Sequence, residues 1–294
     1  MANPVTVGLD GSRESVTAAC WAAREADLLG TRLELVHVQE EPGRPARPLL
    51  PVASTEVQRR WTEGLLHEAR DEVRRLYPDL EVTSRRLHGT PATTLIRAAA
   101  SSDMLVMGSR GLGSMAGFLL GSVALDTVVA ADQPVVLVRS PPGTVAPADG
   151  CSTAGAVVAG VDLGRPCDAL LAFAFAEASR HGCPLHLVHG WTAPPVLGYA
   201  PSLDSCGPGE MSQEMTTELS GMMSPWCDRF SEVKVDVQVR PGRPAIHLVE
   251  ASHDAVLVVV GRRIRRSAYG AHIGPITHAV LHHAAAPVAV VAHE

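Results

Sequence analysis

Met104-Leu105-Val106-Met107-Gly108-Ser109-Arg110-Gly111 is the stretch that decides the fold, and after nine further residues the chain reads Gly121-Ser122. A short apolar run that ends in closely spaced glycines is typical of a buried strand leading into a turn. The second half of the chain repeats this arrangement. There the apolar run Ala255 to Val260 precedes Gly261-Arg262-Arg263-Ile264, nine residues, and Gly274-Pro275.

The repeat extends over both halves of the chain at a nearly constant offset. Asp10 matches Asp162, and Leu35-Val36-His37 matches Leu187-Val188-His189, each 152 residues apart. Because a domain typically takes about 150 residues, 294 residues are enough for two copies. The repeat therefore predicts two fused domains of one fold.

The join between the copies is marked by composition. Residues 141–153 are rich in Pro, Gly, Ala and Asp, which favour turns and linkers. We expect a first domain at residues 1–140, a linker at 141–153 and a second domain at 154–294.

Each half alternates short apolar runs with helical patterns, which is typical of the α/β class. Strands joined by helices form a parallel sheet covered on both faces, and ligands bind at the carboxyl ends of such strands. In the first half the helical patterns cover 12–29, 55–77 and 119–131 and begin again at Pro91. The predicted strands cover 5–9, 33–38, 81–87, 104–107 and 134–138.

Composition excludes several classes of protein. The formal charge is −6, whereas a general nucleic-acid coat needs a basic surface. No apolar run approaches the ~18 residues of a membrane span, and the first residues lack the pattern of a signal peptide. Six cysteines without a C-x-x-C pair favour buried or incidental thiols over a metal or redox site. We expect a cytoplasmic protein that contacts neither membrane nor nucleic acid.

Two sites on the expected sheet edge carry complementary chemistry, a carboxylate that suits a purine or ribose and a glycine loop that suits a polyphosphate. Asp10 follows the first strand and Gly108 the fourth, so a carboxylate and a glycine-rich loop face one crevice if these strands are neighbours. Glycine backbones present N–H groups without side chains, and Gly121-Ser122 lies near the start of a helix, whose N-terminus favours phosphate. The spacing is neither a P-loop nor a dinucleotide G-x-G-x-x-G. Glycines that only form turns are the alternative.

These features together resemble the universal stress protein family in its tandem, ATP-binding form, over nearly the whole chain. The resemblance rests on Asp10, the Gly89-Thr90-Pro91 turn and the G-x2-G-x9-G-S loop. It implies two Rossmann-like domains, similar to adenine nucleotide alpha hydrolases, each with a five-stranded parallel sheet of order 3-2-1-4-5. It also implies ATP, with Mg2+, as the ligand, pairing of the two domains within a chain, and a homodimer.

The resemblance further assigns a binding set in the first domain. Asp10 and Val38 are placed at the adenosine, and the rest surround the ribose and phosphates or precede that loop. The full predicted set is Asp10, Val38, Met107, Gly108, Arg110, Gly111, Gly121, Ser122 and Val123.

The second domain departs from the pattern at two positions. Ile264 replaces a glycine where a positive φ angle is disfavoured for a β-branched side chain, and Pro275 removes a hydroxyl and an N–H donor. Asp162, Gly261, Arg262 and Gly274 remain as candidates for a second ligand site. The four arginines at 262, 263, 265 and 266 either replace the lost donors for an anion or form a solvated basic face.

Histidines and acids give no catalytic or metal-binding set. His278 and His282 have helical i,i+4 spacing without a third ligand in register, and His37 and His189 are expected to be packed or hydrogen-bonded. The loop from Gly108 to Ser122 contains no acid to activate water. We expect a nucleotide-binding regulator that a protein partner reads. The alternatives are a slow ATPase or nucleotidyl- or phosphoryl-transfer enzyme, a nucleotide-free interaction module, and an adenine cofactor protein.

Overall fold

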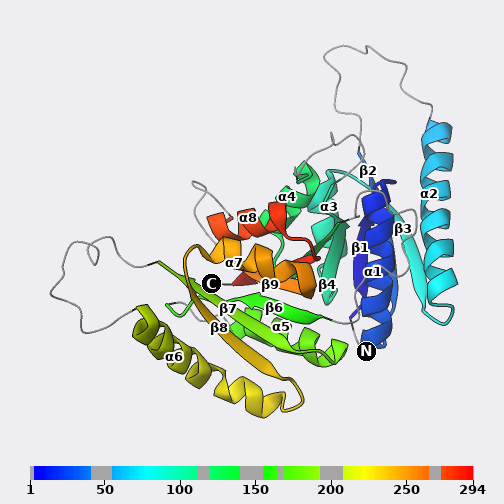
Figure 1. Ribbon diagram of the computed structural model, residues 1–294. Coiled ribbons are helices and arrows are strands. Elements are labelled where there is room, and N and C mark those ends of the chain that lie inside the picture. Colours follow the sequence, from blue (N-terminus) through cyan, green and yellow to red (C-terminus); the bar gives the residue numbers. More distant parts are fainter. Residues whose placement is uncertain are drawn as a thin grey trace, which may run out of the picture. The chain divides into compact units, whose positions relative to one another are not determined.

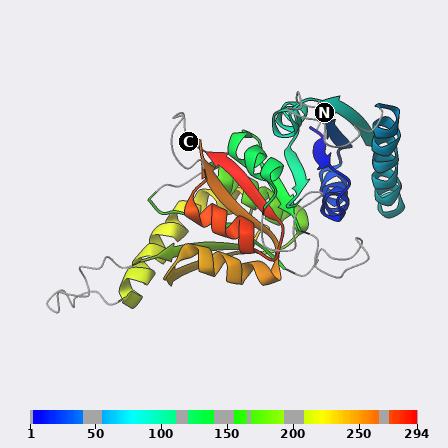
Figure 2. The same cartoon turned by 90° about the horizontal axis from the view of Figure 1, so that it is seen from above.

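The computed structural model describes residues 3–40, 55–110, 120–139, 155–164, 168–192, 208–264 and 273–293. The chain divides into two compact units, Met1–Cys151 (unit 1) and Ser152–Glu294 (unit 2). Each unit is an α/β sandwich in which helices cover both faces of a parallel sheet (Figures 1 and 2).

Unit 1 confirms the predicted five-stranded parallel sheet and its order, β3-β2-β1-β4-β5. Helices α1 and α2 pack together on one face, and α3 and α4 on the other (Figure 1). The strands are β1 (Val5–Leu9), β2 (Leu33–Gln39), β3 (Val82–His88), β4 (Met104–Gly108) and β5 (Val135–Val138), and the helices are α1 (Arg13–Leu29), α2 (Thr55–Leu76), α3 (Pro91–Ala98) and α4 (Ser122–Ala130).

Unit 2 repeats this topology with the order β8-β7-β6-β9-β10, again parallel. A 3-10 turn, η2 (Ser252–Asp254), leads into β9. The strands are β6 (Ala156–Gly160), β7 (Leu185–Trp191), β8 (Val235–Pro241), β9 (Ala255–Arg263) and β10 (Val288–His293), and the helices are α5 (Asp168–His181), α6 (Pro208–Arg229), α7 (Pro244–Ala251) and α8 (Pro275–His283).

Local sequence explains where the first helix begins and ends. The Ser12 hydroxyl accepts a hydrogen bond from the Ser15 N–H at 3.1 Å, which caps one of the open donors of α1. Gly30 ends the helix in the left-handed conformation with φ 61°, which glycine adopts without strain. Gly182 does the same after α5, with φ 59°. The matched glycines confirm the repeat at the level of helix ends.

One predicted boundary is wrong. Helix α4 begins at Ser122 rather than at residue 119, because Gly121 has extended backbone angles of φ −68° and ψ 146° and serves as the N-cap. Residues 111–119, which include Gly111, lie outside the described residues.

Among the described cysteines, Cys20 and Cys183 are buried and Cys227 is half-buried, and all three are free thiols. Burial raises the pKa of the Cys20 thiol to about 11, so this group stays protonated and unreactive at neutral pH. Cys20 and Cys183 are therefore the buried thiols that the sequence predicts. No described helix is long and apolar enough to cross a membrane.

Gly108 lets the end of β4 pack directly against the first turn of α1. A Cβ atom at this position would lie 2.8 Å from the backbone carbonyl carbon of Glu14 and 2.9 Å from the Ser15 nitrogen. Backbone atoms of a helix cannot yield as a flexible side chain does. The first glycine of the loop therefore has a packing role that is independent of any ligand.

Gly108→Ala is expected to destabilise the protein by about 1–3 kcal/mol, because the methyl group overpacks this contact. Gly64 in α2 is the matched control, since a Cβ there meets no atom within 4 Å. Gly64→Ala is expected to be neutral or to stabilise by up to ~1 kcal/mol. Urea unfolding of both variants makes the comparison, and equal stabilities would contradict the packing role.

Candidate functional site

Asp10 lies at the carboxyl end of β1, next to the end of β4, and shapes the turn into α1. Its Oδ1 accepts hydrogen bonds from the Ser12 N–H at 2.9 Å and from the Ser12 hydroxyl at 2.6 Å. The same hydroxyl lies 3.4 Å from the carbonyl oxygen of Arg110, on the segment that follows β4. Asp10 and the start of the glycine loop are thus held at one sheet edge, as the sequence predicts for neighbouring strands.

Cationic side chains surround the start of this loop. A guanidinium nitrogen of Arg110 lies 3.4 Å from a carboxylate oxygen of Glu14 in the first turn of α1. Burial lowers the pKa of Arg139, which follows β5, and the positive charge of Arg110 lowers it further. Arg139 was not among the predicted site residues. Arg110 and Arg139 offset the charges of Glu14 and Asp10 at this edge, and their guanidinium groups are donors that an anion can accept.

The start of α4 offers backbone donors at the same edge. The Gly121 N–H donates to the Ser109 carbonyl at 3.0 Å, which brings the helix start next to the residue after β4. Gly121 has no side chain with which to cap α4, and N–H groups of a first helical turn lack partners within the helix. Ser122 and Val123 belong to this turn and so are placed where the sequence predicts phosphate contacts.

An aromatic side chain that the sequence did not single out flanks Asp10. The Trp61 ring on α2 meets the His37 ring edge-on, with centroids 5.6 Å apart, and is 49% exposed. His37 in turn donates from Nδ1 to the Leu9 carbonyl at 2.8 Å, which confirms its predicted hydrogen-bonding role. A Cβ on Gly11, the residue after Asp10, would lie 3.0 Å from the Trp61 ring. An exposed indole therefore stands beside the predicted adenosine position.

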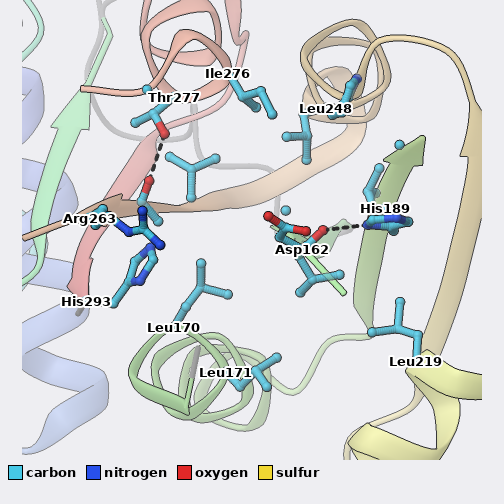
Figure 3. A pocket seen from close by; sticks show the side chains of 18 of the residues that line it. Asp162, Leu170, Leu171, His189, Leu219, Leu248, Arg263, Ile276, Thr277 and His293 are labelled. Carbon is cyan, nitrogen blue, oxygen red and sulfur yellow. Dashed lines mark hydrogen bonds between the residues drawn. The ribbon is translucent and has the colours of Figure 1, made fainter. Parts of the chain in front are cut away.

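Unit 2 has a cavity of about 420 Å3 at the corresponding edge, within the range of small-molecule sites (Figure 3). Asp162 lies in its wall, and its Oδ1 accepts from the Gly164 N–H at 3.1 Å, in the same type of turn that Asp10 makes. His189 donates from Nδ1 to the Val161 carbonyl at 3.0 Å and so repeats His37. The two units thus share the aspartate turn and the histidine contact at the carboxyl ends of β1 and β6.

The predicted residues of the second domain are only partly brought together. Asp162, Gly261 and Gly274 line the cavity. Arg262 is buried and is not a lining residue, whereas Arg263 is one. Successive residues of a strand point to opposite faces, so only one of this pair faces the cavity. That alternation could have distinguished the two arginines in the sequence.

The substituted positions of unit 2 adopt ordinary backbone conformations. Pro275 is the first residue of α8, where the absence of an N–H is tolerated. No described residue other than glycine has a positive φ, and Ile264 donates its N–H to the His293 carbonyl. The described part of this loop has therefore settled into a geometry that does not require glycine at Ile264. Residues 265 and 266 lie outside the described residues.

The predicted i,i+4 histidine pair lies on α8. The ring centroids of His278 and His282 are 4.4 Å apart. Neither ring is among the residues that line the cavity, so this pair does not contribute to the site.

Comparisons with known proteins agree with the repeat. The model of the universal stress protein family matches residues 1–139 and 154–292. A universal stress protein of Mycobacterium tuberculosis is 33% identical over 291 residues, which cover 97% of this chain and 96% of that protein. One from Mycolicibacterium smegmatis is 32% identical over 296 residues, 98% of this chain and 96% of that protein.

Solved structures show the same fold. The crystal structure of a universal stress protein from Archaeoglobus fulgidus aligns over the whole of both chains with a TM-score of 0.66 and 17% identity. The crystal structure of a putative universal stress protein from Pseudomonas aeruginosa aligns over 99% of this chain and 94% of that protein, with a TM-score of 0.61 and 15% identity. The chain therefore belongs to the universal stress protein family and carries two tandem copies of its domain.

Proposed function

We propose that unit 1 binds ATP with Mg2+ and that the chain acts as a nucleotide-dependent regulator in the cytoplasm. The observation that carries this proposal is the meeting of Asp10, the segment after β4 and the uncapped start of α4 at one sheet edge. An acceptor for a sugar and donors for phosphates are the two halves of a nucleotide site.

The adenosine would lie between Asp10 and Val38. A carboxylate has lone pairs for about four hydrogen bonds, so Asp10 holds Ser12 and still accepts from a ribose hydroxyl. The exposed face of Trp61 offers a surface on which a flat base stacks. The carboxylate would thus select the sugar, and the indole would favour an aromatic base.

The phosphates would extend from Gly108 toward α4. The backbone N–H groups of Ser122 and Val123, the Ser122 hydroxyl and the Arg110 guanidinium supply donors, with Gly111 and Gly121 in the same predicted set. Mg2+ would neutralise the phosphate charge that these donors leave. Nucleotide binding would change a surface at this edge that a partner protein, or a second copy of the chain, recognises.

The contacts of the two carboxylates at this edge favour a regulatory role over ATP hydrolysis. Asp10 is committed to the turn into α1, and Glu14 is paired with Arg110. In the proposed complex Asp10 also holds the ribose, so both described carboxylates have other partners than a water at the phosphates.

Asp10→Ala is expected to weaken Mg-ATP binding by about tenfold or more, because a hydrogen bond to a charged acceptor is lost. Asp162→Ala, the same change at the matched position of unit 2, is the control and is expected to leave ATP affinity unchanged. Isothermal titration calorimetry of the nucleotide-free chain measures both. Equal losses of ATP affinity in the two variants, or a loss in Asp162→Ala alone, would place ATP outside the predicted site. Release of phosphate from ATP that depends on Asp10 would support the enzyme alternative.

Ser122→Pro is expected to reduce ATP affinity more than Ser122→Ala. Both variants remove the hydroxyl, whereas only proline also removes the first backbone donor of α4, and proline at this position leaves a helix intact. Unit 2 already carries this proline at position 275, which shows that the fold accepts it. The same calorimetric titration compares the two variants. Identical affinities would exclude a contact of this N–H with phosphate.

A further inference from the structure

The cavity of unit 2 is more aliphatic than the matched region of unit 1. At the repeat offsets of 152 and 153 residues, three of its lining residues on α5 and α6 are larger apolar side chains than the alanines of unit 1, and a fourth replaces an arginine. Leu170 and Leu171 stand where the first half has Ala18 and Ala19, and Met222 and Met223 stand where it has Ala69 and Arg70.

The rest of the wall continues this character. Leu219 and Leu248 face the cavity from α6 and α7, and Ile276 faces it from α8 (Figure 3). Unbranched thioether side chains such as those of Met222 and Met223 adapt to ligands of irregular shape. Two polar side chains of the wall are already engaged, His189 with the Val161 carbonyl and Thr277 with the Gly261 carbonyl. The wall thus suits a flexible hydrocarbon better than a base with polar edges.

One end of the cavity carries the positive charge of Arg263. Arg263 lies there beside His293, apart from Asp162 and His189 (Figure 3). Arg263 matches Arg110 of unit 1, but the counterpart of Glu14, which pairs with Arg110, is Pro166. No described carboxylate forms an ion pair with Arg263. The position has therefore kept its cation and lost the partner seen in unit 1.

The donors at this end suffice for one anionic group. Pro275 removes the first N–H of α8 and the hydroxyl that Ser122 provides in unit 1, whereas the N–H groups of Ile276 and Thr277 remain at the start of the helix. A triphosphate would bring several charges to a site with one guanidinium and a shortened set of donors. A carboxylate brings one charge and matches a guanidinium in shape.

We propose that the cavity of unit 2 binds an aliphatic monocarboxylate of medium chain length. The carboxylate lies at Arg263, and the hydrocarbon chain lies along the leucine and methionine side chains toward β7. Asp162 repels a carboxylate at the opposite end and so fixes the orientation of the ligand. This site goes beyond the proposed function, because it adds a ligand of another class in the other unit.

The test uses the full-length, nucleotide-free chain and sodium decanoate in equilibrium dialysis. We expect saturable binding of one decanoate per chain. Arg263→Gln is expected to weaken it by about tenfold or more, because the charge-assisted contact is lost. Arg240→Gln changes an exposed arginine on β8 that does not line the cavity, and is expected to have no effect. Arg263→Lys is expected to restore part of the affinity.

A second variant and a second ligand separate the apolar wall from the cation. Met222→Glu places a carboxylate in the wall and is expected to abolish decanoate binding, whereas the half-exposed position on α6 lets the chain fold. Decanol is expected to bind the wild type and Arg263→Gln equally, because it has no charge to lose. Thermal unfolding verifies that each variant is folded. If Met222→Glu does not fold, the result for Arg263→Gln alone decides the test.

Three results would overturn the proposal. The first is decanoate binding that is unchanged in both Arg263→Gln and Met222→Glu, and the second is absence of decanoate binding to the wild type. The third is displacement of decanoate by AMP from the wild type but not from Asp162→Ala. ATP titrations of the same variants keep the two proposals separate. Loss of ATP binding in unit 1 would count against the proposed function, and loss of decanoate binding alone would not.

Discussion

The candidate site of unit 1 depends on the close approach of β4 to the strand-to-helix turn that follows β1. A Cβ at Gly108 would meet the Glu14 backbone, so any larger residue would push the loop away from Asp10. The Ser12 hydroxyl then links the two segments, since it reaches both the Asp10 carboxylate and the Arg110 carbonyl. Parallel pairing of β1 with β4 supplies the scaffold, because it brings both carboxyl ends to one edge.

The same scaffold is used twice, and the two copies differ where a ligand would be recognised. The Asp turn and the histidine contact to the end of the first strand occur in both units. Unit 1 has a serine at the start of α4 and the ion pair of Arg110, whereas unit 2 has Pro275 at the start of α8 and more aliphatic side chains in its cavity. A duplicated domain that keeps its backbone contacts and changes its lining is able to acquire a second specificity without loss of the fold.

Periodicity and the repeat predicted most of the fold, because buried parallel strands are short apolar runs between helical patterns. They placed Asp10 and Gly108 at the ends of two strands, and the family resemblance supplied the order in which these strands are neighbours. The sequence did not predict Trp61 or Arg139 at this edge, because their positions depend on how α2 and β5 pack against distant segments. It selected Arg262 although Arg263 lines the cavity, because the strand alternation was not extended beyond the apolar run that ends at Val260, whereas β9 continues to Arg263. The packing role of Gly108 was equally hidden, since steric need and phosphate binding both favour glycine.

Native mass spectrometry of the full-length chain with Mg-ATP and decanoate determines whether the two units hold different ligands. If they do, the dominant species at saturation carries one ATP and one decanoate on the same chain, because the sites are separate. Mutually exclusive binding, or a chain that carries two ATP molecules and no decanoate, would contradict it.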